Sequence, residues 1–352
     1  MGETMTKRIG VLTGGGDCPG LNAVIRAVVR RSIVLGDYEM VGIKYGWKGL
    51  LERATMPLER ETVTGILYRG GTILGTSRTN IFKDDTTVKT TTENIKKLKL
   101  DAIIAIGGED TLGVAKRMAD LGYKIVGVPK TIDNDLNGTD FTFGFDTAVE
   151  IATDAVDRLH TTAESHNRVL VCEVMGRHAG WIATFSGIAG GADAILIPEK
   201  PIDIGEVCDV IERRHKQGKF FSIIVVAEGA KIKLGQQEKE VTSSARIDEF
   251  GHVQLGGIGQ ELAKLIEKKT GYETRVTVLG HVQRGGKPTA HDRVLATRFG
   301  VAAMNAVHAG RFGVFVALKG KDIVEVPLSQ VTEGIKTVDE DIYEMSKTFW
   351  GY

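Results

Sequence analysis

The sequence has few cysteines, few prolines and no excess of charge of either sign. Its 352 residues include 3 cysteines and 7 prolines, and 45 basic residues balance 45 acidic ones. Because no net positive charge would attract a polyanion, we expect neither a nucleic-acid partner nor binding to a membrane surface. Cys18, Cys172 and Cys208 follow no paired or metal-like spacing, so we expect them to be reduced, buried hydrophobic side chains.

Long apolar runs are also missing, including at the N-terminus. The first eight residues carry charges and lead directly into a short strand pattern, with no apolar stretch as long as a signal peptide or a membrane span. No low-complexity segment or proline-rich linker interrupts the chain. We therefore expect a cytoplasmic protein, and the length predicts two domains with well-developed cores.

Glycine, in contrast, is abundant. It accounts for 44 of 352 residues, or 12.5%, compared with roughly 7% in average proteins. Many of these glycines follow short apolar runs. The excess predicts many backbone turns or places where a ligand closely approaches the main chain.

Short apolar, β-branched runs alternate with helical patterns along most of the chain. Strands are predicted at residues 9–12, 102–106, 125–128, 169–174, 194–197, 223–227, 276–279 and 314–318. Helices are predicted at residues 21–34, 111–121, 147–159, 204–216, 258–269 and 290–309. This alternation is typical of an α/β protein, and the similar pattern in each half predicts two similar doubly wound, Rossmann-like domains with mostly parallel sheets and a site in the cleft between them.

Polar, glycine-containing loops follow the predicted strands, at the sheet edge where such folds bind ligands. They lie at residues 13–20, 107–111, 129–135, 175–180, 228–229 and 280–286. The first of them is predicted to leave backbone amides free to bind phosphate at a helix N-terminus. It has neither the ending of a P-loop nor the spacing of a Rossmann fingerprint, so a simple tight turn is an equal alternative.

The loop at 129–135 places two carboxylates, Asp133 and Asp135, beside Lys130. One carboxylate can take a proton from an attacking hydroxyl, the second can hold Mg²⁺, and the ammonium can neutralise a phosphate. An ordinary turn is the alternative for an isolated copy. Glu109 and Asp110, which follow another glycine loop, favour the interpretation as a phosphoryl-transfer site.

Several arginines stand in or beside these loops and not at regular helical spacing. They are Arg78, Arg168, Arg177, Arg275 and Arg284. A guanidinium binds phosphate through two parallel hydrogen bonds. The set predicts a ligand, or ligands, with phosphate at more than one position.

In order and separation, the motifs at 14–20, 131–135, 175–177 and 280–286 resemble the phosphofructokinase A family, over residues 9 to about 346. The resemblance implies phosphoryl transfer to the 1-hydroxyl of fructose 6-phosphate with Mg²⁺. It also implies a phosphoryl-donor domain at 1–143 plus about 283–333. A fructose 6-phosphate domain would then comprise about 144–282 plus 334–352.

The resemblance also implies roles for single residues. Asp133 would be the general base, Thr131 and Asp135 would support substrate and metal, and Arg177 would stabilise the charge that develops in transfer. The remaining substrate contacts would come from Met175, Gly176, Glu228, His281, Arg284, Arg168 and Arg275. Of these, Glu228 would accept a sugar hydroxyl, and His281 and Arg284 would bind the 6-phosphate. Arg168 and Arg275 would reach that phosphate from a second subunit, so the resemblance implies at least a homodimer, with a homotetramer as the expected assembly.

On the donor side, Gly15, Gly16 and Arg78 resemble donor contacts, while Glu109 and Asp110 are the expected metal-associated carboxylates. Glu109 stands where the family usually has aspartate. ATP-using members typically have glycine at the positions of Asp110 and Lys130. An aspartate there occupies the space of the nucleotide α-phosphate and repels a third phosphate, whereas a lysine can bind pyrophosphate. We therefore expect pyrophosphate as the donor and a reversible reaction, and Val114, near the adenine position, favours the same conclusion.

Three alternatives remain at this point: an ATP-dependent 6-phosphofructokinase, a kinase of another sugar phosphate such as sedoheptulose 7-phosphate, and a catalytically silent sugar-phosphate-binding regulatory protein. A catalytically silent protein is disfavoured because the chain has the expected base Asp133, the second carboxylate Asp135 and Arg177 together. Lys219-Phe220-Phe221 and His160 replace basic effector residues of allosteric relatives, so we expect weak or absent allosteric control. The segment 231–253 is predicted to be a surface excursion without chemistry.

Overall fold

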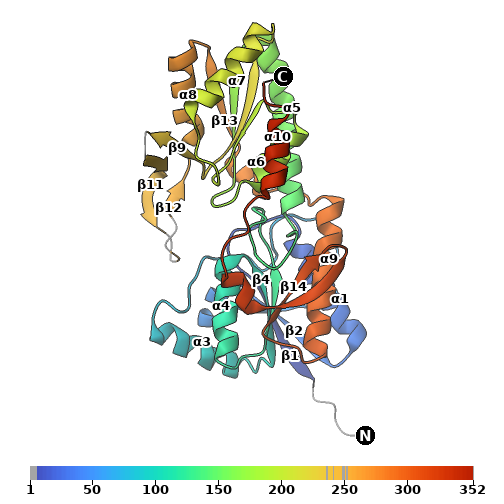
Figure 1. The fold of residues 1–352 in the computed structure, drawn as a ribbon. Coiled ribbons are helices and arrows are strands. Elements are labelled where there is room, and N and C mark those ends of the chain that lie inside the picture. The colour runs from blue at the N-terminus through green and yellow to red at the C-terminus, as the bar shows by residue number, and fades with distance from the viewer. Residues whose placement is uncertain (1–5, 235–236, 241, 248–249, 251–252, 352) are drawn as a thin grey trace.

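The structure, a computed structural model, describes residues 6–234, 237–240, 242–247, 250 and 253–351. Two α/β regions lie one above the other, with the N-terminus at the lower end of Figure 1 and the C-terminus at the upper end. We call the part built on a seven-stranded sheet the larger region and the part built on a four-stranded sheet the smaller region. The predicted fold class is confirmed.

The sheet of the larger region has the order β15-β14-β5-β4-β1-β2-β3. Its inner strands pair in parallel, and only the two edge strands, β15 and β3, are antiparallel to their neighbours. The strands are β1 (Lys7–Thr13), β2 (Tyr38–Ile43), β3 (Thr55–Pro57), β4 (Ala102–Gly107), β5 (Ile125–Pro129), β14 (Val314–Lys319) and β15 (Asp322–Pro327). The carboxyl ends of β1, β4 and β5 therefore meet at one edge of this sheet.

Helices cover both faces of this sheet because its central strands are apolar on both faces. Along β4, Ile104 and Ile106 face one buried cluster, while Ile103 and Ala105 face another. The first cluster includes side chains of α1 and α9, which pack against each other, and the second includes those of α4. The helices of the larger region are α1 (Leu21–Leu35), α2 (Trp47–Glu52), α3 (Asp85–Lys97), α4 (Glu109–Asp120), α9 (Ala290–His308) and the 3-10 helix η2 (Leu328–Thr332).

The sheet of the smaller region is entirely parallel, in the order β13-β6-β8-β7. Its strands are β6 (Val169–Val174), β7 (Ala194–Leu196), β8 (Ser222–Ala227) and β13 (Thr274–Val278). Its helices are α5 (Phe145–His166), α6 (Trp181–Ala189), α7 (Ile204–Lys216), α8 (Ile258–Thr270), α10 (Glu340–Lys347) and the 3-10 helix η1 (Gly280–Arg284). Every residue of β6 and β8 is buried, as expected for strands covered on both faces.

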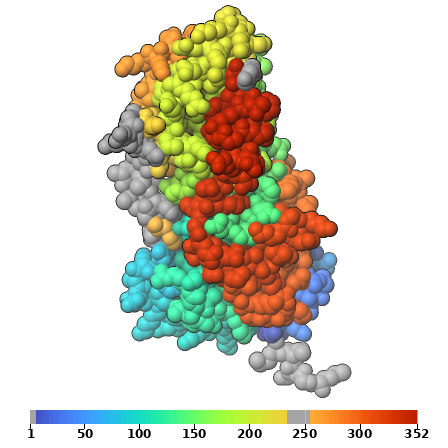
Figure 2. All heavy atoms as spheres, viewed as in Figure 1, coloured from blue at the N-terminus to red at the C-terminus, as the bar shows by residue number. Residues whose placement is uncertain are grey.

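The chain passes between the two regions more than once. After β15 and η2 in the larger region it crosses to α10, which packs on α6 of the smaller region. The C-terminal residues consequently run over both halves of the molecule (Figure 2).

The domain boundaries proposed from the sequence remain a prediction. No helix in the described part of the chain is long and apolar enough to cross a membrane.

The segment 231–253 lies partly outside the described residues. What is described forms two antiparallel pairs, β9 (Lys231–Leu234) with β10 (Gln237–Glu240), and β11 (Thr242–Ile247) with β12 (Val253–Leu255). Phe250 lines a cavity that Glu109 and Asp110 also line. The segment therefore contributes a side chain beside the predicted donor site, in addition to its strands.

Candidate active site

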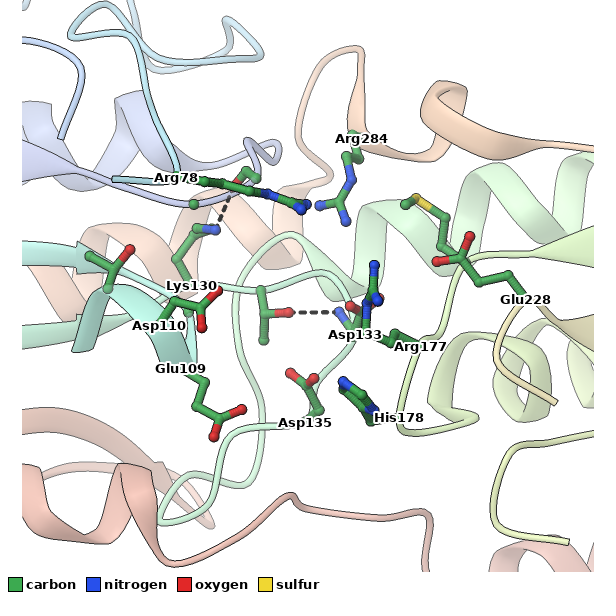
Figure 3. A pocket seen from close by; sticks show the side chains of 16 residues that line it. Arg78, Glu109, Asp110, Lys130, Asp133, Asp135, Arg177, His178, Glu228 and Arg284 are labelled. Atoms are coloured by element: carbon green, nitrogen blue, oxygen red, sulfur yellow. Dashed lines mark hydrogen bonds between the residues drawn. The ribbon is translucent and has the colours of Figure 1, made fainter. Parts of the chain in front are cut away.

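The polar loops of both regions meet in one pocket between the two sheets (Figure 3). From the larger region it is lined by Gly15, Gly16, Arg78, Gly108, Glu109, Asp110, Thr111, Lys130, Thr131, Asp133 and Asp135. From the smaller region and the η1 turn it is lined by Met175, Arg177, His178, Glu228 and Arg284. The structure thus brings together loops that lie more than two hundred residues apart in the sequence.

The loop after β5, residues 130–142, is the acidic loop of the pocket. Thr131 Oγ1 accepts a hydrogen bond from the Asp133 amide at 3.0 Å, and its carbonyl accepts one from Thr142 Oγ1 at 2.8 Å. Asn134, which has a positive φ of 51°, turns the chain and accepts from the Thr142 amide at 3.1 Å. An asparagine adopts this left-handed conformation more readily than most residues. These bonds hold the two limbs of the loop together on either side of Asp133.

The two carboxylates of this loop repel each other. Burial, followed by the charge of Asp133, raises the pKa of Asp135 above its ordinary range, and Glu109 adds to the effect. Asp133 Oδ1 is buried and has no hydrogen-bond partner within the described protein. A hydroxyl proton or a cation would satisfy that oxygen, so the loop suits a substrate hydroxyl or a metal ion.

The glycine loop after β1 differs from the prediction in its hydrogen bonding. The Gly14 amide donates to the Ile106 carbonyl at 2.9 Å and the Gly15 amide to the Ser77 carbonyl at 3.0 Å. These two amides are therefore occupied, one by a carbonyl of β4 and the other by a carbonyl of a neighbouring loop, and the prediction that the whole loop presents bare amides was wrong at these positions. Gly16 still lines the pocket, where an added Cβ would lie 2.8 Å from Arg284 Nη1.

Lys130 connects the acidic loop to the glycine loop. It is buried, and its ammonium donates to the Gly16 carbonyl. Burial lowers the pKa of Lys130, although the nearby acidic groups oppose that shift. A buried ammonium at the pocket wall is costly unless an anion approaches it, so Lys130 is well placed to bind a phosphate oxygen.

The first turn of α4 lines the predicted donor side of the pocket. Gly14 and Gly107 both leave room for Thr111, because an added Cβ at either position would lie within 2.5 Å of its side chain. Glu109 and Asp110 stand at the positive end of the α4 dipole, where negative charge is stabilised. Among the described residues, no three His, Cys, Asp or Glu side chains lie close enough to hold a metal ion by themselves.

The loop after β6 presents Arg177 to the pocket. Gly176 has a φ of 137°, and an added Cβ there would lie 2.8 Å from the Ala179 carbonyl oxygen. Gly229 approaches even more closely, since its Cβ would lie 1.9 Å from the Arg177 carbonyl oxygen. Only glycine at both positions allows this turn, which points Arg177 toward Asp133 (Figure 3).

Glu228 follows β8 on the side of the pocket opposite Lys130 (Figure 3). Its pKa is raised to about 7, first by burial and then by the charge of Asp133, while Arg177 and Arg284 oppose the shift. A carboxyl in such a place changes protonation near neutral pH. It can accept a hydrogen bond from a sugar hydroxyl most effectively when ionised.

Arg284 lies nearer the glycine loop than its predicted role requires. Its Nη1 donates to the Asp17 carbonyl at 3.4 Å, and its guanidinium lies beside that of Arg78 across the top of the pocket (Figure 3). Two guanidinium groups that face one space attract a ligand with several negative charges.

Four predicted substrate residues lie outside the pocket lining. Gly176, which precedes Arg177 in the sequence, is buried, and His281 is exposed in η1. Arg168 and Arg275 both pair with Glu273, at 2.8 and 2.5 Å. Their predicted contacts would come from a second subunit, so these contacts stay predictions.

Three lining residues were not selected from the sequence: Gly108, Thr111 and His178. Each stands within a loop that sequence analysis did identify. His178 directly follows Arg177. It could have been identified from its position next to this predicted residue, but not from its own residue type.

Comparison with known proteins gives consistent results. The phosphofructokinase family model matches residues 8–307. The chain is 58% identical over 345 residues to a Streptomyces coelicolor protein named pyrophosphate--fructose 6-phosphate 1-phosphotransferase, covering 98% of this chain and 100% of that protein. It is 54% identical over 336 residues to another protein of that organism, named ATP-dependent 6-phosphofructokinase 3, covering 96% and 98%.

Among solved structures, a pyrophosphate-dependent phosphofructokinase from Nitrosospira multiformis superposes with a TM-score of 0.82 at 22% identity, covering 95% of this chain and 86% of that one. At that identity the superposition shows the fold alone. The family match over most of the chain and the two full-length relatives, together with the pocket geometry, lead to one conclusion: the chain belongs to the phosphofructokinase family.

Proposed function

We propose that the protein transfers a phosphoryl group from pyrophosphate to the 1-hydroxyl of fructose 6-phosphate, reversibly, giving fructose 1,6-bisphosphate. The observation that carries this proposal is that Asp110 and Lys130 line the same pocket as Asp133. The relative at 58% identity, whose name gives this reaction, supports it.

In this mechanism residues of the larger region transfer the proton and neutralise the leaving phosphate, and a residue of the smaller region stabilises the transferred group. Asp133, with its buried and unpartnered oxygen, takes the proton from the 1-hydroxyl as the oxygen attacks phosphorus. Arg177, facing it from the smaller region, stabilises the charge on the transferred group. Lys130 neutralises the phosphate that leaves.

Mg²⁺ fits the residues present. The mutual repulsion of Asp133 and Asp135, to which Glu109 adds, is what a bound cation would relieve. Mg²⁺ usually binds through one or two carboxylates plus substrate phosphates, so the lack of a ready cluster of three such groups among the described residues agrees with this metal. One or two of Asp135, Glu109 and Asp110, together with oxygens of the pyrophosphate, would hold it, and when bound it would neutralise charge on the pyrophosphate.

The choice of donor depends on the wall that Asp110 forms. Glu109 and Asp110 line both the main pocket and a neighbouring cavity of about 310 Å³, which Val114, Lys116 and Arg117 also line. A nucleotide that used this second cavity would have to pass the Asp110 carboxylate with its own negative phosphates. Pyrophosphate binds on the Lys130 side of Asp110 and does not have to pass this carboxylate.

The second cavity is also the observation that favours ATP as an alternative donor, because it offers space beyond Asp110 for a base. The test is the initial rate with fructose 6-phosphate and Mg²⁺, comparing pyrophosphate with ATP, for the wild type and for Asp110→Gly. We expect activity with pyrophosphate alone in the wild type and some ATP use in the variant. ATP-only activity in the wild type would overturn the donor assignment, and inactivity with both donors would favour the silent regulatory protein.

We further propose an assembly of at least two subunits, with a homotetramer as the larger form, in the cytoplasm. β13 is an edge strand of the smaller sheet; its last residue, Val278, and Val282 in the following η1 turn are exposed by 52% and 61%. Arg275 belongs to β13, and Arg168, which directly precedes β6, pairs with Glu273 at the amino end of β13. A second subunit that covered these valines would bring its arginines toward the fructose 6-phosphate end of the site.

A further inference from the structure

The chain segment that crosses from the larger to the smaller region, residues 334–338, runs along the acidic loop; we call it the strap. Ile335 forms an antiparallel bridge with Leu136. The Lys336 amide donates to the Asp135 carbonyl at 2.9 Å, and Asn137 Nδ2 donates to the Gly334 carbonyl at 2.6 Å. The strap therefore pairs with residues 135–137 of the acidic loop, which follow Asp133 closely in the sequence.

The side chain of Lys336 holds the other limb of the same loop. Its Nζ donates to the carbonyls of Thr139 at 3.0 Å and of Asp140 at 2.7 Å. The Asp140 carbonyl also accepts from Asn134 Nδ2 at 3.4 Å, and Asn134 is the neighbour of Asp133. Lys336 thus bonds to both limbs of the loop, through its main chain on one side and through its ammonium on the other.

Lys336 also contacts the smaller region. Its carbonyl accepts from Trp181 Nε1 at 3.0 Å, and its Nζ lies 5.1 Å from the centre of a Trp181 ring. Trp181 is the first residue of α6, four residues after Arg177. Nearby, the Glu199 carboxylate accepts from the amides of both Gly180 and Val338, which ties the strap to the same turn.

We propose that Lys336 is a positioning residue that fixes Asp133 in the larger region relative to Arg177 in the smaller region. The inference rests on the proposed function, which makes these two side chains the base and the charge stabiliser of one reaction. Lys336 is the point at which hydrogen bonds from the Asp133 loop and from the Arg177 turn meet. A displacement of about 1 Å between reacting groups can cost about a hundredfold in rate.

The test is Lys336→Met, which keeps an unbranched side chain but removes the donor to Thr139 and Asp140. We expect kcat with pyrophosphate to fall by about tenfold or more, with the KM values of both substrates little changed, because alignment and not binding is lost. Lys336→Arg retains donors that can reach the two carbonyls and should recover part of kcat.

A matched control is Lys347→Met. Lys347 also lies over two aromatic rings, Tyr343 at 5.1 Å and Trp350 at 6.0 Å, but its ion pair is with Glu344 on its own helix. This variant should leave kcat unchanged. Equal kcat in Lys336→Met and Lys347→Met would overturn the inference, whereas a wild type inactive with every donor would instead refute the proposed function.

A second variant keeps the test decisive if Lys336→Met fails to fold. Trp181→Phe removes only the indole donor to the Lys336 carbonyl and keeps an aromatic ring beside the ammonium. We expect it to lower kcat too. Where Lys336→Met does fold, the double variant should lose less than the product of the two single losses, because both act through one link. Unchanged kcat in Trp181→Phe, or independent losses in the double variant, would show that Lys336 does not join the two sides.

Discussion

The two regions contribute different chemistry to one pocket. The larger region supplies most of the acidic groups, the buried Lys130 and the glycine loops, in segments that follow the carboxyl ends of β1, β4 and β5. The smaller region supplies Met175, Arg177, His178 and Glu228 at the ends of β6 and β8. In the proposed mechanism, the groups that move protons or neutralise the donor thus lie mainly on one side, and the groups that recognise the sugar or stabilise charge lie mainly on the other.

The largest expected effect comes from removing the base on the larger side. Asp133→Ser should lower kcat by at least about a hundredfold while leaving fructose 6-phosphate binding nearly intact, because a general base acts in the transition state. Steady-state rates give kcat, and calorimetric titration with fructose 6-phosphate gives the dissociation constant.

Asp140→Ser is the matched control for that experiment. Asp140 belongs to the same loop, but its carboxylate pairs with Lys319 at 3.2 Å and with the Gly320 amide at 2.7 Å, outside the pocket lining. We expect its kcat to stay close to that of the wild type. A loss in Asp140→Ser as large as in Asp133→Ser would mean that the loop, and not the base, controls the rate.

A smaller effect is expected on the sugar side, and it should depend on pH. Because the pKa of Glu228 is raised to about 7, the group loses its charge as the pH falls through neutrality, and its ability to accept a sugar hydroxyl weakens. The KM for fructose 6-phosphate should therefore be about tenfold higher near pH 6 than near pH 8. Glu228→Gln should have a raised KM that no longer follows this profile.

The substrate itself titrates in the same range, since a phosphate monoester has a second pKa of about 6. Glu228→Gln is the control for this, because the substrate's own titration remains in the variant. The KM for pyrophosphate should not differ between the two proteins in its pH profile. If wild type and variant share one profile for fructose 6-phosphate, Glu228 is not the titrating group.

The strands of both regions were predictable because buried parallel strands read as short apolar runs, and all eight predicted strands are present. α3 was missed because it contains many threonines, whose β-branched side chains disfavour helix; its Asp84 cap and tertiary packing stabilise it instead. β15 was missed because it is a partly exposed edge strand without a buried run. Sequence pattern therefore predicted the centre of the larger sheet better than its edges, whereas it predicted all four strands of the smaller sheet.

For the site, the loops were predictable but several of their contacts were not. The amides of Gly14 and Gly15 bond to Ile106 and Ser77, which are far away in the sequence. The place of Lys336 behind Asp133 depends on how the chain returns from the larger region, and no local pattern marks it. Such contacts arise from tertiary packing, so residue type and spacing cannot reveal them.

The smallest expected effect concerns a separate cavity, which lies in the smaller region and is lined in part by His160, Arg214 and Phe221. The Arg214 guanidinium pairs with Asp193 at 2.8 Å, both side chains are 7% exposed, and Phe221 lies over the guanidinium. An effector phosphate would have to displace a buried ion pair, and breaking such a pair typically costs about 3–5 kcal/mol. ADP or phosphoenolpyruvate should therefore change the rate by less than about twofold, below the roughly fivefold lower limit of typical allosteric coupling. Rates measured at subsaturating fructose 6-phosphate, with and without each compound, decide the matter: a sigmoidal curve or a larger change would show that this cavity regulates the enzyme despite its internal ion pair.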